Sequence, residues 1–131
     1  MKKLILAIDD SKAIRFLLQT VFGREYQIVT VPDGYSALYF LNHRNLPDLI
    51  IADPRLPDMP DWELIRQIST SGMYGQIPVV VLSSLDRHET EMQCRDLGVV
   101  ACFMKPFNPV EMLESVKLLM NEGIGASVMA V

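Results

Sequence analysis

The stretch LILAIDDSKAIR, residues 4–15, ends a run of apolar residues with two adjacent aspartates. An apolar run of this kind is typical of a β-strand that is buried on both faces. Asp10 or Ser11 could cap a helix that follows, but capping would use only one acidic side chain. Because adjacent carboxylates repel each other and are costly to bury unpaired, the pair of Asp9 and Asp10 needs a further explanation.

Strand-like and helix-like segments alternate along the rest of the chain. The strand-like runs are residues 3–8, 26–31, 48–52, 77–82 and 99–104. Apolar residues at helical spacing lie between or after them: Ile14, Leu17, Leu18 and Val21; Leu64, Ile65 and Ile68; Met112, Leu113, Val116 and Met120; with weaker segments at 34–44 and 86–97. The alternation predicts an α/β fold with right-handed crossovers, namely a doubly wound parallel sheet of five strands with five helices, as in flavodoxin-like proteins.

Length and composition fit one domain with a core of its own. The chain has 131 residues, of which 50% are hydrophobic and 21% charged. Its 12 Lys and Arg against 16 Asp and Glu give a net charge of -4, which argues against nucleic acid as a partner. No apolar stretch approaches the roughly 20 residues that span a bilayer, and the aspartates interrupt any signal peptide, so we expect no membrane partner. Two cysteines are too few for a disulfide framework, which favours a cytoplasmic location.

Polar residues follow four of the five predicted strands. Asp9 and Asp10 end the first strand, Asp53 the third, Ser83 the fourth and Lys105 the fifth. If the strand order is 2-1-3-4-5, the first and third strands are neighbours, and the three aspartates converge at the edge where such sheets bind ligands. Three carboxylates packed together need a cation, and oxygen ligands favour a hard one such as Mg²⁺. The acidic pair is therefore interpreted as part of a metal site.

Each of these residues also has an ordinary structural explanation. An Asp after a strand is often a cap or a turn residue, a lone Ser there is often structural, and a lone Lys is often a solvated charge. The functional interpretation depends on their joint placement at the tips of four strands.

The motifs LAIDDS, LIIADPRLPDM, VVVLSS and KPF (105–107) occur in that order, and together they resemble a response-regulator receiver domain of two-component signalling. The resemblance covers residues 3 to about 121. It implies a receiver domain over residues 1–121, followed by a C-terminal tail or the start of a linker at 122–131.

The resemblance assigns the acidic residues individual roles. Asp53 would be the phosphoacceptor, Asp10 a direct Mg²⁺ ligand, and Asp9 a ligand acting chiefly through coordinated water. The backbone carbonyl of Arg55 would complete the protein ligands.

The same resemblance implies how the switch works. Ser83 would hydrogen-bond the phosphoryl group, Lys105 would pair with it, and the Lys105–Pro106 peptide bond would be cis. The donor would be the phosphohistidine of a histidine kinase or phosphotransfer protein. The output would reach a downstream protein through the face formed by residues 86–121. Such a protein catalyses only its own phosphotransfer and dephosphorylation and is not otherwise an enzyme.

Several positions depart from the family pattern. Pro54 has no N–H to offer a phosphoryl oxygen, and Arg55 and Leu85 occupy two variable positions beside the site. Asp61 stands where glycine is usual, and because Asp tolerates a positive φ, we expect the turn to be kept. Cys102 holds the slot of a switching Tyr or Phe, while the next residue, a Phe, should face the other side of its strand.

Three alternatives compete with a phosphorylated receiver. Pro54 and Cys102 give some support to a phosphorylation-defective receiver that acts as a constitutive interaction module. A phosphatase with an aspartyl nucleophile would want an acid two residues after it, where this chain has Arg55. A flavin-binding protein of the same topology would want a Ser/Thr/Gly-rich phosphate loop after the first strand, which DDSKAIR does not supply.

Overall fold

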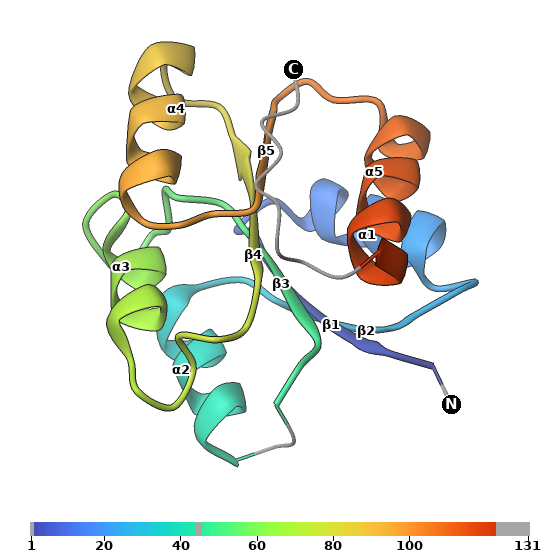
Figure 1. Cartoon of the computed structure of the whole chain (residues 1–131), viewed down its shortest axis with the longest axis horizontal. Helices are drawn as coiled ribbons and strands as arrows, with labels where there is room; N and C mark the ends of the chain where they lie inside the picture. The colour runs from blue at the N-terminus through green and yellow to red at the C-terminus, as the bar shows by residue number, and fades with distance from the viewer. Residues whose placement is uncertain (1, 44–45, 123–131) are drawn as a thin grey trace.

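The computed structural model describes residues 2–43 and 46–122, in which strands and helices alternate along the chain (Figure 1). The elements lie within one or two residues of the predicted segments at most ends. Their bounds are β1 Leu4–Ile8, α1 Lys12–Phe22, β2 Gln27–Val31, α2 Gly34–His43, β3 Leu49–Ala52, α3 Glu63–Thr70, β4 Val79–Ser83, α4 Arg87–Asp96, β5 Ala101–Met104 and α5 Pro109–Glu122.

The five strands form one parallel sheet in the order β2-β1-β3-β4-β5, which confirms the predicted α/β topology. At the carboxyl end of β1, Ile8 is in register with Val31 of β2 and Ala52 of β3. The chain moves from β1 to one side for β2 and then returns across β1 for β3. The point where the order reverses therefore lies between the ends of β1 and β3, where α/β sheets bind ligands.

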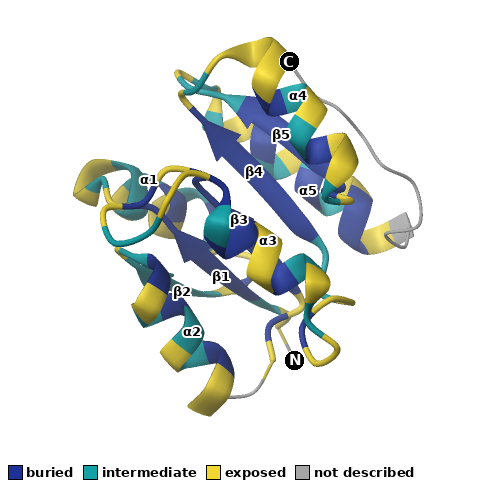
Figure 2. Cartoon of the chain, turned by 90° about the vertical axis from the view of Figure 1, so that its left-hand side faces the viewer, coloured by how far each residue is buried: buried dark blue, intermediate teal, exposed yellow. Residues whose placement is uncertain are grey.

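Helices cover both faces of the sheet. Figure 1 shows α2, α3 and α4 on one side, and α1 and α5 on the other. Successive side chains of β1 point to opposite faces of the sheet and so contribute to both cores. Leu6 and Ile8 pack with α2 and α3, whereas Ile5 and Ala7 pack with α1 and α5. The central strands are therefore buried on both faces, as Figure 2 shows in dark blue.

The start of α1 resolves the capping question raised by the acidic pair. Ser11 is the N-cap, and its hydroxyl accepts a hydrogen bond from the backbone N–H of Ile14 at 3.2 Å. The carboxylate of Asp10 makes no hydrogen bond or ion pair with any residue that the structure describes. It is therefore free for another role.

The turn into α3 corrects one expectation. The residue with a positive φ is not Asp61 but the next one, Trp62, with φ 69°. Trp62 is buried, and its backbone N–H donates to the carbonyl of Pro54 at 2.8 Å. Burial of the indole and this hydrogen bond hold a bulky residue in the left-handed region, where an isolated residue would be strained.

Two sequence predictions concern the end of the chain and membranes. Glu122 is the last residue of α5, so the rest of the expected tail or linker lies outside the described residues. Within the described residues, no helix combines the length and the apolar character needed to span a membrane.

Candidate functional site

Backbone hydrogen bonds fix the residues that follow β1 and β3. The N–H of Asp9 donates to the carbonyl of Val31 at 3.1 Å, and the N–H of Asp53 donates to that of Ile8 at 2.9 Å. These bonds continue the sheet ladder by one residue on each strand. Asp9 and Asp53 are therefore held by the sheet itself, at the point where the strand order reverses.

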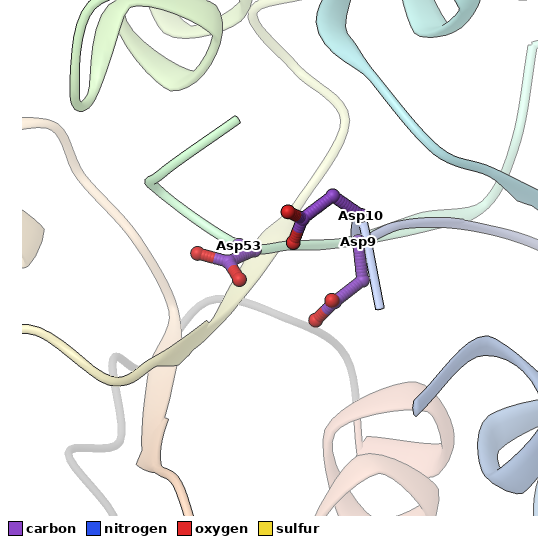
Figure 3. A group of neighbouring side chains, drawn as sticks. All are labelled: Asp9, Asp10 and Asp53. Carbon is purple, nitrogen blue, oxygen red and sulfur yellow. The ribbon is translucent and has the colours of Figure 1, made fainter. Parts of the chain in front are cut away.

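The three predicted acidic residues come together there. One carboxylate oxygen from each of Asp9, Asp10 and Asp53 lies within 4.8 Å of the other two. Figure 3 shows the three side chains as neighbours at the ends of their strands. Asp9 is 1% exposed and Asp53 4%, whereas Asp10 is exposed to solvent. A set of carboxylate oxygens with one open side fits a divalent cation that prefers oxygen ligands.

Lys105 supplies the positive charge of the site. Its ammonium nitrogen lies 2.8 Å from Oδ2 of Asp53, to which it donates a hydrogen bond, and 2.8 Å from Oδ2 of Asp9, where it forms an ion pair without good hydrogen-bond alignment. Burial alone would lower the pKa of Lys105, but the two carboxylates outweigh it and raise the pKa. The lysine is therefore a fixed cation. The peptide bond that follows it, Lys105–Pro106, is cis as expected.

The second oxygen of Asp53 is also occupied. Oδ1 accepts a hydrogen bond from the backbone N–H of Arg55 at 2.8 Å. Burial raises the pKa of Asp53, assisted by the charge of Asp9, and the hydrogen bonds from Lys105 and Arg55 oppose it without cancelling it. Asp53 is thus a buried carboxylate held in one orientation. Its environment stabilises the negative charge less than water would.

Ser83 is fully buried at the end of β4 and points its hydroxyl toward α4. Its Oγ accepts a hydrogen bond from the backbone N–H of Leu85 at 3.0 Å and lies 3.0 Å from Oγ1 of Thr90. Its backbone carbonyl accepts a hydrogen bond from the N–H of Lys105 at 2.7 Å. Ser83 therefore connects the lysine of the site to the first turn of α4.

The model of the response regulator receiver domain matches residues 5–117, which is most of the chain. The chain belongs to the response regulator receiver family. Among curated proteins, this receiver is 30% identical over 118 residues to sporulation initiation phosphotransferase F of Bacillus subtilis (strain 168), covering 89% of this chain and 93% of that protein. The chain spans about half the length of several other curated relatives that it matches.

Solved structures of receivers have the same fold. The chemotaxis response regulator CheY4 of Vibrio cholerae aligns with a TM-score of 0.80 and 26% identity, over 89% of this chain and 98% of that chain. The Mn(2+)-bound form of response regulator Rcp1 aligns with a TM-score of 0.79 and 26% identity, over 95% and 98% of the two chains. The site described above therefore lies in a receiver domain of the kind that two-component systems use.

Arg55 of this receiver is turned toward Asp61. Its Nε donates to Oδ1 of Asp61 at 3.1 Å and its terminal nitrogen to Oδ2 at 2.8 Å. The guanidinium beside Asp61 holds the pKa of that carboxyl below its usual range. This pairing was not predicted from the sequence, which placed Arg55 only at a variable position beside the site.

Cys102 and Phe103 of β5 face opposite sides of the sheet, as predicted from the alternation along a strand. Cys102 packs in the core under α2, α3 and α4, while Phe103 packs in the opposite core with α1 and α5. Cys102 and Cys94 are both buried free thiols, and burial raises the pKa of each. Such thiols are unreactive and act mainly as small packing groups.

Proposed function

We propose that this receiver accepts a phosphoryl group on Asp53 from the phosphohistidine of a histidine kinase or phosphotransfer protein, in a Mg²⁺-dependent reaction. The receiver domain covers residues 1–121, with a tail or linker at 122–131, and its output passes to a protein through the face formed by residues 86–121. The observation that carries the proposal is the buried carboxylate of Asp53, which has Asp9 and Asp10 as acidic neighbours and forms an ion pair with Lys105.

Asp53 would act as the nucleophile. A carboxylate is ionised at neutral pH and attacks phosphorus directly, so the step needs no general base. A bond forms between a carboxylate oxygen and phosphorus while the bond between phosphorus and the imidazole nitrogen breaks, and the imidazole leaves with the electron pair. The backbone N–H of Arg55 and the ammonium of Lys105 hold the nucleophile in position.

Asp9, Asp10 and Asp53 would hold Mg²⁺, with the backbone carbonyl of Arg55 as a further ligand. The all-oxygen donor set and the free carboxylate of Asp10 support this assignment. A structural relative described as the Mn(2+)-bound form of response regulator Rcp1 supports a divalent ion in this fold. When bound, the ion supplies positive charge against which an anionic donor can approach an anionic acceptor.

Lys105 and Ser83 would receive the phosphoryl oxygens. The ammonium of Lys105 is held at the acceptor carboxylate, so it needs no large movement to pair with a phosphoryl group there. Ser83 ends the adjacent strand and offers one hydroxyl, which would leave its present partner to donate to a phosphoryl oxygen. Phosphorylation would thereby change the contacts at the start of α4.

Labelling with acetyl phosphate tests the proposal. The wild type, Asp53→Asn and Asp96→Asn are incubated with acetyl phosphate in Mg²⁺ or in a chelator, and intact masses are measured. Asp96 is an exposed carboxylate of α4 and serves as the matched control. We expect one added phosphate on the wild type and on Asp96→Asn in Mg²⁺ only, and none on Asp53→Asn. Lack of labelling of the wild type would instead favour the constitutive interaction module, and equal labelling of Asp53→Asn would reject Asp53.

A further inference from the structure

The hydroxyl of Ser83 has a partner on α4 that the proposed phosphotransfer does not use. Oγ of Ser83 lies 3.0 Å from Oγ1 of Thr90, and both side chains are 0% exposed. The backbone N–H of Leu85 donates to the same Ser83 oxygen at 3.0 Å. The contact joins the end of β4 to the first turn of α4. Because solvent does not reach either side chain, the loss of a hydrogen-bond partner there is costly.

Helix α4 has little apolar contact to hold it against the sheet. Its only buried residues are Thr90 and Cys94, and Figure 2 shows exposed residues over much of its surface. By contrast, α3 buries an aliphatic group of three residues on the same face: Leu64, Ile65 and Ile68. Every other helix in the described part of the chain buries aliphatic or aromatic side chains. The Ser83–Thr90 hydrogen bond is therefore a large share of what positions α4.

Cys102, the residue of β5 beneath α4, has no bulky side chain that could hold the helix against the sheet. Cys102 pairs in register with Val81 of β4 and packs, with Cys94 of α4, in the core beneath the helix. A thiol is small and a weak donor, so its movement would displace little volume. The polar contact between β4 and α4 is thus carried by the two hydroxyls.

We propose that Thr90 is the residue through which the state of Ser83 controls α4. This inference rests on the proposed phosphorylation of Asp53. The single O–H of Ser83 cannot donate to a phosphoryl oxygen and to Thr90 at once. Either hydroxyl can be the donor in the present contact, and in both cases Oγ of Ser83 leaves Thr90 when it turns from α4 to the phosphoryl group. The hydroxyl of Thr90 then donates to the carbonyl of Asp86, one helical turn earlier, which also accepts the N–H of Thr90. The helix keeps its own hydrogen bonds but loses its polar tie to the sheet.

The test uses three variants. Thr90→Val has nearly the same shape as threonine but lacks the hydroxyl, and Thr90→Ser keeps the hydroxyl. Cys102→Ala is a control on β5, beneath the same helix. Each protein is titrated with beryllofluoride in Mg²⁺. Fluorine NMR measures formation of the complex, and backbone amide shifts are followed in residues 87–96 and, for comparison, in 34–43. Amide hydrogen exchange of residues 87–96 is measured on the free proteins.

We expect free Thr90→Val to exchange faster in residues 87–96 but not in 34–43. We expect it to bind beryllofluoride about fivefold more tightly, because the hydrogen bond between Ser83 and Thr90 no longer has to break. Its α4 amides should shift less on binding than those of the wild type, whereas Thr90→Ser and Cys102→Ala should resemble the wild type. A normal complex with unchanged α4 exchange and shifts in Thr90→Val would overturn the role of Thr90, as would a Thr90→Ser variant that behaves like Thr90→Val. Failure of the wild type to bind beryllofluoride would instead contradict the proposed function.

Discussion

The ammonium nitrogen of Lys105 lies 2.8 Å from Oδ2 of Asp53, so the proposed acceptor carboxylate is paired before any phosphoryl group arrives. The same nitrogen lies 2.8 Å from Asp9. One cation thus balances two buried carboxylates, and the exposed carboxylate of Asp10 adds a third negative group. The site has an excess of negative charge that a divalent ion would relieve, which leads to opposite expectations for the lysine and for Asp10.

Removing the lysine should destabilise the metal-free protein. Lys105→Met keeps most of the apolar length of the side chain but removes the ammonium that pairs with both Asp9 and Asp53. We expect a loss of about 2 kcal/mol in the free energy of unfolding, below the usual range for a broken buried pair because the ammonium keeps some contact with water. Chemical denaturation without divalent ions measures it. Mg²⁺ should stabilise this variant more than it stabilises the wild type. An equal or smaller stabilisation would contradict the claim that Lys105 and a divalent ion neutralise the same carboxylates.

Removing Asp10 should have the reverse effect. Asp10→Ala relieves repulsion among the carboxylates, so the metal-free protein should melt at a higher temperature than the wild type. Its affinity for Mg²⁺ should fall by at least about tenfold, since even residues that only orient metal ligands contribute that much. Thermal melts with and without Mg²⁺ measure the first effect. Fluorescence of Trp62, the one tryptophan of the chain, measures the second, because its backbone N–H donates to the carbonyl of Pro54, the residue that follows Asp53. An unchanged increment from Mg²⁺ would reject Asp10 as a ligand.

The acidic cluster was predictable from the sequence because it depends on a general property of parallel sheets. Each strand ends at the same edge, so polar residues that follow neighbouring strands are brought together whatever the helices do. Asp9, Asp10, Asp53 and Lys105 were placed in this way. The sheet order that makes β1 and β3 neighbours was the assumption on which the placement rested, and the structure confirms it.

The other contacts depend on details that apolar patterns do not report. The partner of Ser83 depends on the rotation of α4 about its axis, and that helix has too few buried apolar residues for its pattern to indicate which side faces the sheet. The pairing of Arg55 with Asp61 and the left-handed Trp62 depend on loop geometry. The spacing from Arg55 to Asp61 carries no helical or strand period from which the contact could be inferred.

The pairing of Arg55 with Asp61 should affect the lifetime of the phosphorylated state. Asp61→Asn releases the guanidinium, which can then bind phosphoryl oxygens and cover the approach of water. We expect dephosphorylation to slow by about threefold, a small factor because exposed ion pairs are weak and Arg55 is already free part of the time. The decay of intact-mass labelling measures the rate. The double variant Arg55→Ala/Asp61→Asn should return to the rate of Arg55→Ala alone; persistence of the slow rate would show that Asp61 acts without Arg55.

The carboxylate of Asp58 should make stability depend on acid pH. It accepts hydrogen bonds from the backbone N–H groups of Gly34 and Tyr35, each at 2.9 Å, at the start of α2. Partial burial alone would raise the pKa of Asp58, but the hydrogen bonds from Tyr35 and Gly34, with a smaller contribution from its own backbone N–H, outweigh it and lower the pKa. A lowered pKa means that the contribution is present above the unfolded pKa of about 3.9 and is lost as pH falls through the folded pKa.

Asp58→Asn tests this dependence, because an amide offers one acceptor oxygen in place of two. At neutral pH we expect the free energy of unfolding of this variant to be about 1 kcal/mol lower than that of the wild type. The difference should shrink as the pH is lowered below about 4. Denaturant unfolding of both proteins at a series of pH values measures it, and a difference that stays constant or grows in acid would refute the assignment.

The most direct measurement of the central claim locates the phosphoryl group on the chain. The wild type is labelled with acetyl phosphate in Mg²⁺ and treated with borohydride, which reduces an aspartyl phosphate to homoserine, and its peptides are sequenced by mass spectrometry. The account predicts homoserine at position 53 and at no other aspartate, with none when Mg²⁺ is chelated. Reduction at a different aspartate, or labelled protein in which Asp53 remains intact, would contradict it.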